Sequence, residues 1–334
     1  MNDTSLTIEI LYPELANLYG ELANAHFLAR AARESGADVT IIETPVTDTP
    51  HFLDGSVDFV YIGAMPETAQ VVISDALRPH TAAIRARIDA GQIILATGNA
   101  VEIFGQGMES ADLEGFQGLG LFPALAHIDL WKRHNSFYVG TFERTSTPRV
   151  PPTHSTASIP EQQTDAGRLP KLTADGQQVS AAANSPAAVQ IVGFKSQFGH
   201  STFTSSAGSA HARLASSENA HSTAPYHARE QYPPLFRTIR GMSFSGQPVD
   251  RAASTPARHS IGSSIAEDGE GVRIQNFMGT YLIGPLLILS PLFTQELLRM
   301  LGIEQPQLPY EDAVYDAFDA RLHEFMEPTR HFSI

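Results

Sequence analysis

The chain contains no cysteine among its 334 residues. This absence excludes disulfide bonds, thiolate metal sites and every mechanism that uses a cysteine nucleophile. Charged residues are also scarce, at 17%, and the formal net charge is -14. Such a charge repels phosphate backbones and anionic membrane surfaces, because binding to either needs a basic face. The composition therefore predicts neither a nucleic acid nor a membrane partner.

A long uninterrupted hydrophobic run is missing as well. The longest apolar stretch, residues 281–293, contains Gly284, Pro285, Ser290 and Pro291 and is too short to span a bilayer. The first residues do not combine a basic stretch with an apolar segment, so no secretory signal is predicted. We therefore expect a cytoplasmic protein.

Hydrophobic residues make up 42% of the chain, enough for a sizeable core. Small and polar residue types concentrate between about residues 145 and 265, where periodicity is weak apart from a strand-like run at 235–244. Segments of this composition bury too little apolar surface to offset the entropy of ordering them. The sequence predicts a single domain over residues 1–334, with disordered low-complexity insertions at about 145–188 and 200–265.

Strand and helix signals alternate over the first hundred residues. Apolar and β-branched runs at 7–12, 38–43, 58–62 and 93–97 predict four strands with helical segments between them. Strands that alternate with helices form a parallel sheet covered on both faces. We therefore predict a three-layer α/β domain around a mostly parallel, flavodoxin-like sheet. Its functional residues should follow the carboxyl ends of the strands.

The second half of the chain is less regular. The last helical segment places Val314, Phe318, Leu322 and Phe325 on one face, which predicts a helix that packs on the core. The elements predicted here are a hairpin-like pair at 127–133 and 137–142, strands at 189–194 and 272–282, and helices at 294–301 and 310–326.

Several motifs occur in a characteristic order. Residues 11–24 read Leu-Tyr-Pro-Glu-Leu-Ala-Asn-Leu-Tyr-Gly-Glu-Leu-Ala-Asn, and residues 62–70 read Ile-Gly-Ala-Met-Pro-Glu-Thr-Ala-Gln. Further on, residues 118–122 read Gly-Leu-Gly-Leu-Phe, 191–194 read Ile-Val-Gly-Phe, and 279–287 read Gly-Thr-Tyr-Leu-Ile-Gly-Pro-Leu-Leu. Together they resemble class I glutamine amidotransferases of the cobyric-acid-synthase type, and most closely the glutaminase subunit of lipid II isoglutaminyl synthase.

The resemblance covers most of the chain outside the predicted insertions. It implies a class I glutamine amidotransferase-like fold. It also implies a partner, since the related glutaminases supply ammonia to a Mur-ligase-like synthetase that amidates a cell-wall (peptidoglycan) precursor.

The resemblance also shows where the catalytic residues should stand. The nucleophilic cysteine of the family corresponds to Gly98, and its histidine corresponds to Ile283. A third departure is Lys195, which replaces the glutamate of a Gly-Phe-Glu-Asn-His motif. By analogy with hydrolase triads, loss of nucleophile and base together costs about a million-fold in turnover. Glycine adopts the strained backbone of such a turn without penalty. We therefore predict no intact catalytic residues and no glutaminase activity.

Four residues remain as candidates for ligand binding. Gly63 and Ala64 stand in a turn that helps to hold the oxyanion in active relatives, and Asn99 follows the cysteine position. The change to alanine either closes this turn to a ligand or leaves an ordinary strand-to-helix connection. Arg133 falls near the arginine that binds the glutamine carboxylate in relatives, although a surface arginine is the simpler interpretation.

Other reactive groups have structural explanations. Thr97 should face away from the neighbouring Gly98, because successive strand residues point to opposite faces. Ser201 stands beside a histidine at the start of the second predicted insertion, where a polar linker is the simpler interpretation. The histidines of this insertion show no ligand spacing, so neither a metal nor a cofactor is predicted. They are His200, His211, His221, His227 and His259.

The motif at residues 11–24 has two interpretations. Its polar residues form a ligand or partner surface, or they cap and brace a helix whose Leu18 and Leu22 pack into the sheet. For the whole chain, the leading hypothesis is a pseudo-glutaminase that binds or regulates a Mur-ligase-like synthetase. The alternatives are a functional amidotransferase subunit with an unrecognised nucleophile, or a sensor that still binds glutamine.

Overall fold

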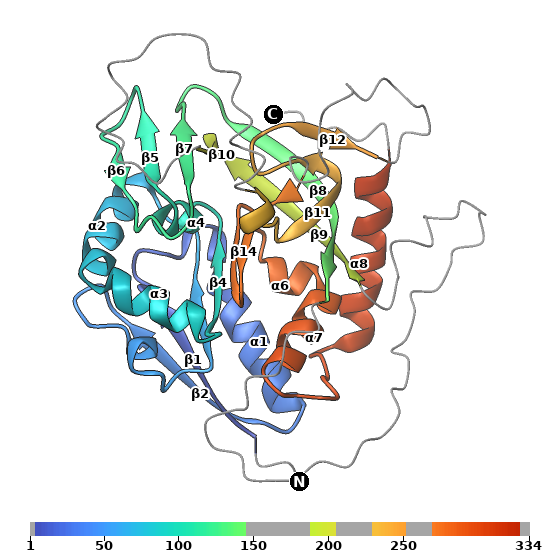
Figure 1. The fold of residues 1–334 in the computed structure, drawn as a ribbon. Helices are drawn as coiled ribbons and strands as arrows, with labels where there is room; N and C mark the ends of the chain where they lie inside the picture. The colour runs from blue at the N-terminus through green and yellow to red at the C-terminus, as the bar shows by residue number, and fades with distance from the viewer. Residues whose placement is uncertain (1–3, 145–187, 205–228, 252–268, 328–334) are drawn as a thin grey trace.

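The computed structural model describes residues 4–144, 188–204, 229–251 and 269–327. Its centre is a six-stranded sheet in the order β14-β15-β4-β3-β1-β2 (Figure 1). The strands are β1 Ser5–Leu11, β2 Asp38–Thr44, β3 Phe59–Ile62, β4 Ile93–Thr97, β14 Val272–Ile274 and β15 Phe277–Thr280. All neighbours are parallel except β14, which runs antiparallel to β15. With β15 as the fifth parallel strand, the order is the 2-1-3-4-5 of a flavodoxin-like sheet. The predicted fold class is confirmed.

Side chains alternate between the two faces of this sheet, so each central strand contributes to two hydrophobic layers. Ile94 and Ala96 of β4 belong to one layer, and Ile93 and Leu95 to the other. Figure 1 shows helices on both sides. The first layer packs against α2 (Glu67–Leu77), α3 (Thr81–Asp89) and α4 (Ala100–Phe104), and the second against α1 (Ala23–Glu34), α6 (Leu286–Leu289) and α7 (Pro291–Met300). Short 3-10 turns are η1 (Leu18–Gly20), η2 (His51–Asp54) and η3 (Arg78–His80).

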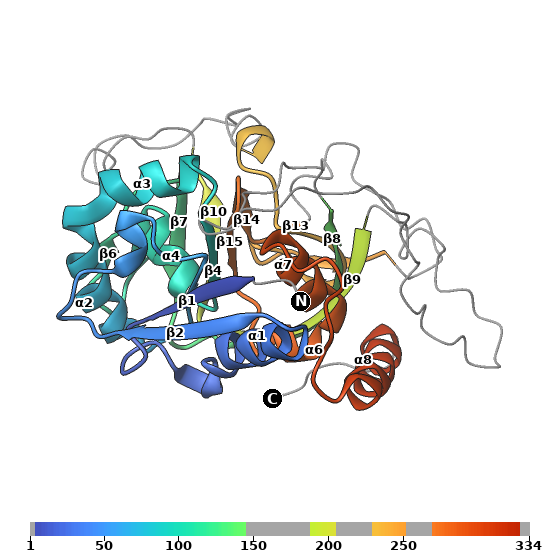
Figure 2. The ribbon, with the colours of Figure 1, turned by 90° about the horizontal axis from the view of Figure 1, so that it is seen from below.

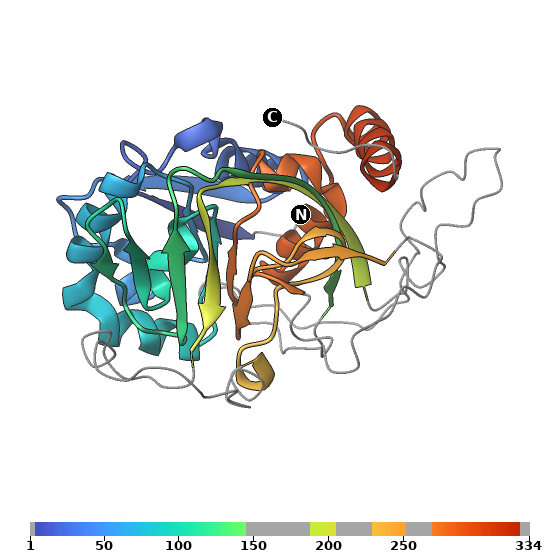
Figure 3. The same cartoon turned by 90° about the horizontal axis from the view of Figure 1, so that it is seen from above.

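Two smaller sheets extend the domain. The first, in the order β10-β7-β5-β6, contains β5 Gly107–Ser110, β6 Phe116–Gln117, β7 Ala124–Ile128 and β10 Gly199–Phe203. The second, in the order β12-β11-β8-β9, contains β8 His134–Glu143, β9 Ala188–Gln197, β11 Phe236–Met242 and β12 Pro248–Asp250, and β13 (Gly269–Glu270) pairs with β11. Figure 3 shows β8 and β9 side by side as a curved ribbon.

The C-terminal helix α8 (Glu311–Met326) lies outside this ribbon (Figure 2). Its Phe318 and Phe325 are buried against Val139 of β8 and Val192 of β9. The predicted apolar face of this helix is therefore the face that packs. No helix in the four described ranges is long and apolar enough to cross a membrane.

Two sequence predictions are corrected by the sheet topology. The segments at 127–133 and 137–142 do not form a hairpin, because β7 pairs with β5 and β10 whereas β8 pairs with β9 and β11. A local sequence pattern predicts that a strand exists, but the strand with which it pairs depends on contacts with residues far away in the chain. The segment at 200–265 contains β10, β11 and β12, so its described part is built into the sheets. The segment at 145–187 lies outside the described residues.

Candidate functional site

The turn after β4 lies at the carboxyl edge of the central sheet, between β3 and β15. Gly98 at this turn has a φ of +61°, and α4 begins two residues later at Ala100. A left-handed backbone between a strand and a helix is the geometry that presents nucleophiles at a sheet edge. Gly98 keeps this backbone without carrying a side chain.

Three positions that the sequence singled out separately meet at this turn. A Cβ atom on Gly98 would lie 2.5 Å from the Cβ of Ala64 and 3.2 Å from Cγ2 of Ile283. Both neighbours are buried, each with 3% of its surface exposed. Close packing of protein interiors leaves no room for an added atom at such a separation. The space into which a nucleophile would project is occupied by aliphatic carbon.

The turn after β3 contributes to this closure. A Cβ atom on Gly63 would lie 2.8 Å from the carbonyl oxygen of Ala16, so the close approach of the two backbones requires glycine there. The next carbonyl, of Ala64, accepts a hydrogen bond from the Leu18 N–H at 2.9 Å. The turn therefore anchors the loop after β1, and the Ala64 methyl group blocks the approach to Gly98. This geometry favours the interpretation in which Ala64 closes the turn to a ligand. We call Gly98, with Ala64 and Ile283 packed against it, the closed turn.

Asn99 ties the two turns together. Its Nδ2 donates to the Met65 carbonyl at 2.8 Å, and its Oδ1 accepts from the Met65 N–H at 3.0 Å. Both ends of the amide are thus used within the protein. Asn99 has a structural partner where the sequence suggested a ligand contact.

Arg133 is exposed on the connection between β7 and β8. It donates to the Tyr19 hydroxyl at 2.6 Å and lies over the Phe198 ring, 5.1 Å from the ring centroid. Neither contact belongs to the group around Gly98. The structure therefore places this predicted ligand residue at the surface, in contact with Tyr19, whose neighbour Leu18 is bonded to Ala64.

Glu21 forms a buried polar cluster directly behind Gly98. Thr97, the residue before the turn, donates its hydroxyl to the Glu21 carboxylate at 2.6 Å. The hydroxyl of Tyr61 lies 2.7 Å from the Thr97 hydroxyl, and the N–H of Gly284 donates to Glu21 at 2.9 Å. Burial raises the pKa of Glu21 above its usual range. Thr97 does face away from Gly98, as predicted, but it meets a carboxylate there.

This cluster explains part of the 11–24 motif. Asn24 donates to the Tyr61 hydroxyl at 2.8 Å and accepts from the N–H of Leu287 at 2.8 Å, so it braces α1 against the start of α6. The prediction that Leu18 packs into the sheet is wrong, since 37% of its surface is exposed. The motif combines an internal brace with an outward-facing loop. The importance of Glu21 was not foreseen, although its position inside the motif was a usable signal.

A second buried carboxylate lies in α4. Glu102 accepts hydrogen bonds from Gln70 Nε2 and from the Tyr281 hydroxyl, both at 2.8 Å. The Tyr281 hydroxyl lies 2.7 Å from Ser201 Oγ of β10, so α2, α4, β10 and the end of β15 are connected. Burial raises the pKa of Glu102 to about 7. Glu102 stands three residues beyond Asn99, and its burial follows only from the fold.

Glu102→Gln is expected to flatten the pH dependence of stability. The pKa of Glu102 rises from 4.5 to about 7 on folding, so between these values the folded carboxyl is protonated while the unfolded one ionises. The protonated Glu102 carboxyl contributes fully to the free energy of unfolding below pH 4.5, the pKa in the unfolded chain. As the pH rises from 4.5 to about 7, this contribution is lost at 1.36 kcal/mol per pH unit, about 3 kcal/mol in all. Gln stays neutral throughout. Urea unfolding at about pH 5 and about pH 8 measures the effect. A difference between variant and wild type that is constant with pH would contradict it.

A buried ion pair joins β9 to the segment before β14. Lys195 donates to the Glu270 carboxylate and to the carbonyl of Ser243 at 2.9 Å. Glu270 also accepts from the Thr280 hydroxyl at 2.9 Å and the Tyr281 N–H at 2.8 Å. Burial lowers the pKa of Lys195, and the neighbouring carboxylate opposes that shift. Lys195, which replaces the glutamate of the Gly-Phe-Glu-Asn-His motif, is therefore the counter-ion of Glu270.

The segment around Lys195 also positions the closed turn. The carbonyl of Phe194 accepts a hydrogen bond from the N–H of Ile283 at 2.9 Å, as an isolated antiparallel bridge. This bridge holds Ile283 against Gly98. A backbone contact thus joins the motif at 191–194 to the motif at 279–287.

The histidines give a mixed result. His200 lies half-buried in β10 and not in a linker, with its ring centroid 6.2 Å from that of His134. Burial lowers the pKa of His200. Within the described ranges, no three histidine, cysteine or acidic residues are grouped so that they could hold a metal ion. His211, His221, His227 and His259 lie outside the described residues.

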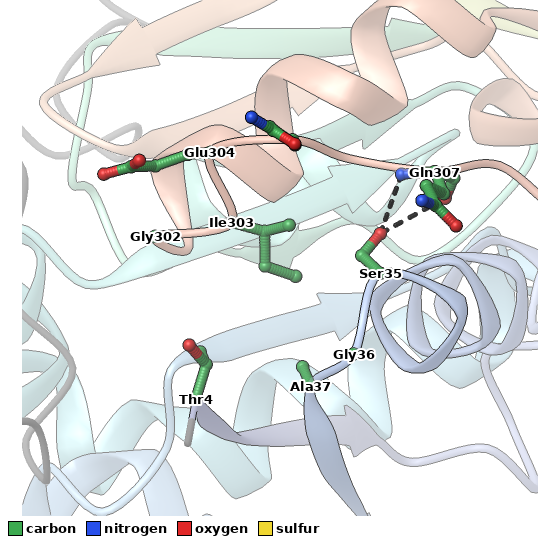
Figure 4. A pocket seen from close by; sticks show the side chains of 9 residues that line it. Thr4, Ser35, Gly36, Ala37, Gly302, Ile303, Glu304 and Gln307 are labelled. Carbon is green, nitrogen blue, oxygen red and sulfur yellow. Dashed lines mark hydrogen bonds between the residues drawn. The ribbon is translucent and has the colours of Figure 1, made fainter. Parts of the chain in front are cut away.

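An open pocket lies at the opposite, amino edge of the sheet (Figure 4). Its volume is about 370 Å³, and its lining comes from the start of β1, the end of α1 and the loop after α7. The Ser35 hydroxyl accepts from the Gln307 N–H at 2.8 Å across one side. This pocket contains none of the residues around Gly98.

No protein-family model and no curated protein sequence match the chain. Among solved structures, it is similar to a glutamine amidotransferase at 11% identity and a TM-score of 0.40, over 88% of this chain and 98% of that one. It is similar to a glutamine amidotransferase from Thermotoga maritima at 8% identity and a TM-score of 0.37, over 98% of this chain and 100% of that one. A ThuA-like protein from Bacteroides uniformis is similar at 10% identity and a TM-score of 0.40, over 90% and 93% of the two chains. These likenesses are too weak to assign a family, and the fold class rests on the strand order of the chain itself.

Proposed function

We propose that this chain is a catalytically silent glutamine amidotransferase-like subunit, a pseudo-glutaminase. In this role it binds or regulates a Mur-ligase-like synthetase that amidates a cell-wall precursor. The observation that carries the proposal is the turn at Gly98, which keeps a left-handed backbone with no side chain and faces the carbons of Ala64 and Ile283. The order of the sequence motifs supports the family relationship. The closed turn supports the loss of hydrolysis.

Partner binding does not require the chemistry that this chain lacks. An interface depends on surface side chains and on their complementarity to a partner. The substitutions at Gly98 and Ile283 lie inside the protein, so they change hydrolysis without changing the surface. A subunit of this kind keeps its partner while producing no ammonia of its own.

The purified chain is expected to release no glutamate from glutamine, alone or with the synthetase. Without nucleophile and base, turnover falls by about a million-fold relative to an active glutaminase. A coupled glutamate assay measures this, with an active class I glutaminase as the positive control. Glutamate release at a rate proportional to the concentration of the purified chain would overturn the proposal.

One observation favours a second candidate, an amidotransferase with an unrecognised nucleophile. The Thr97 hydroxyl donates to the Glu21 carboxylate at 2.6 Å, which is the distance between a nucleophile and its base. Against this candidate, both side chains are fully buried on the side of the sheet that faces α1. Thr97→Val distinguishes the two cases, because any glutamate release that depends on this pair disappears in the variant.

The glutamine sensor is the third candidate. Its pocket would have to include the space between Gly98, Ala64 and Ile283, which these residues fill. Calorimetry with millimolar glutamine tests it. Binding heat that saturates would favour the sensor over the pseudo-glutaminase.

A further inference from the structure

Exposed apolar side chains occur on two loops, one of which is bonded to Ala64 of the closed turn. The large hydrophobic residues that the described part of the chain exposes are Leu18, Tyr19, Val72, Trp131 and Tyr310. Leu18, Tyr19 and Trp131 come from two loops that are joined by the hydrogen bond from Arg133 to the Tyr19 hydroxyl. We name the set Leu18, Tyr19, Trp131 and Arg133 the aromatic rim.

Trp131 is held outward by its polar contacts. Its side chain is 87% exposed, its indole N–H donates to Asp112 at 3.2 Å, and its backbone N–H donates to Asp129 at 3.0 Å. A large ring fixed in this way loses little conformational freedom when a partner covers it. An indole exposed to this degree contributes little to the hydrophobic core.

Tyr19 adopts a left-handed backbone conformation that residues other than glycine rarely adopt. Its φ is 63° and its ψ is 17°, although 48% of its surface is exposed. The adjoining Leu18 N–H bonds to the carbonyl of Ala64, which fixes this loop to the closed turn. Strain of this type persists where the surrounding structure over-determines it, and it is frequent at active sites, ligand clamps and switch regions. Core packing does not account for it here.

Arg133 makes no ion pair with a carboxylate of the described residues, unlike several other exposed cations of this acidic chain. Arg30, Arg78 and Lys132 each pair with a carboxylate, at 3.0, 3.0 and 3.5 Å. Within the described residues, the contacts of Arg133 are the Tyr19 hydroxyl and the face of the Phe198 ring. Its charge is therefore positioned but not neutralised, which makes it complementary to an external carboxylate.

We propose that the aromatic rim is the docking surface for a partner protein that offers an apolar pocket to Trp131 and a carboxylate to Arg133. Trp, Tyr and Arg are the residues that most often dominate binding at protein interfaces. The net charge of -14 argues against a nucleic acid as the occupant. The rim adjoins Ala64, so the partner would cover the edge where an active relative would react. The inference rests on the proposed function, since it names the surface that the synthetase would use.

The test uses the full chain labelled with 5-fluorotryptophan, which reports on Trp131 alone because the sequence has a single tryptophan. The probe is the Mur-ligase-like synthetase, titrated by calorimetry and by fluorine NMR. Trp131→Ala and Arg133→Glu are each expected to weaken binding about 30-fold. The matched controls are Tyr310→Ala and Arg30→Glu. These two residues form another Tyr–Arg pair at the surface, outside the aromatic rim, with the Arg30 guanidinium 4.6 Å from the Tyr310 ring centroid.

Loss of affinity in both rim variants, a shifted fluorine resonance in the complex and unchanged control variants would support the rim. A complex that forms equally well with the rim variants would overturn the rim and leave the proposed function standing. Equal weakening by rim and control variants would also overturn it. If the wild-type chain forms no complex with the synthetase, both proposals fail together.

Discussion

Gly98→Ala is expected to lower the free energy of unfolding by about 3 kcal/mol. Two costs combine at this position. A φ of +61° is unfavourable for alanine by about 1–2 kcal/mol. The added methyl would also lie 2.5 Å from the Cβ of Ala64, and such overpacking costs about 1–3 kcal/mol. Urea unfolding of variant and wild type measures the sum.

Gly120→Ala provides the matched control. Gly120 has a φ of +63°, and a Cβ atom there would meet nothing within 4 Å. This variant should therefore show only the conformational cost, about 1 kcal/mol. Adding Ala64→Gly to Gly98→Ala should recover about 1.5 kcal/mol in a double-mutant cycle, because the clash is removed. Equal costs at positions 98 and 120, with no coupling to Ala64, would show that the turn is not closed in the way described.

Any side chain at position 98 meets the same overlap. The Cβ of a cysteine there would lie 2.5 Å from the Cβ of Ala64 and 3.2 Å from Cγ2 of Ile283. A cysteine at position 98 should therefore carry the same steric cost as an alanine, and Ala64→Gly should relieve part of that cost.

Lys195→Met is expected to lower the free energy of unfolding by about 3 kcal/mol. Removal of one member of a buried ion pair leaves the other charge uncompensated, which typically costs about 3–5 kcal/mol. The lower end applies here because the buried Arg229 guanidinium also attracts Glu270. Lys195 and Glu270 are both fully buried, so solvent cannot replace the lost partner. Thermal and urea unfolding measure the change.

Two variants control for the loss of a lysine as such. Lys132→Met removes a lysine that is 73% exposed and lies 3.5 Å from Asp129, and it should cost at most about 0.5 kcal/mol. Lys195→Met combined with Glu270→Gln should recover part of the loss, because the carboxylate that lost its ammonium partner is then neutral. The recovery should be incomplete, because the buried Arg229 guanidinium then lacks the attraction of Glu270. If Lys195→Met costs no more than Lys132→Met, the buried ion pair does not contribute to stability as inferred.

Much of the central sheet could be predicted from sequence. β4 spans Ile93–Thr97, as its apolar run predicted, and the helix that follows begins at Ala100. The turn η3, which contains Pro79, separates α2 from α3. These elements are defined locally, because buried parallel strands are short apolar runs bounded by turn residues. The outer sheets were predicted less well, since the antiparallel partners of β8 and β9 are not encoded within the strands themselves.

Some residues of the candidate site could be identified from sequence, whereas others could be identified only from the structure. Gly98, Ala64 and Ile283 were each identified from a motif, but a motif does not give the distance between its side chains. The polar clusters around Glu21 and Glu102 were not foreseen. Their partners come from distant segments, and burial, which raises the pKa of both carboxyls, depends on the packing of those segments.

The sequence by itself determined that this chain supplies no cysteine nucleophile, because composition does not depend on conformation. It also determined the alternation of strands and helices, which follows from local periodicity. Only the tertiary structure decided that Ala64 and Ile283, from two other loops, fill the space beside Gly98, and that the loop of Leu18 and Tyr19 is bonded to Ala64. Both features are contacts between segments far apart in the chain, and such contacts exist only once the sheet has brought the segments together.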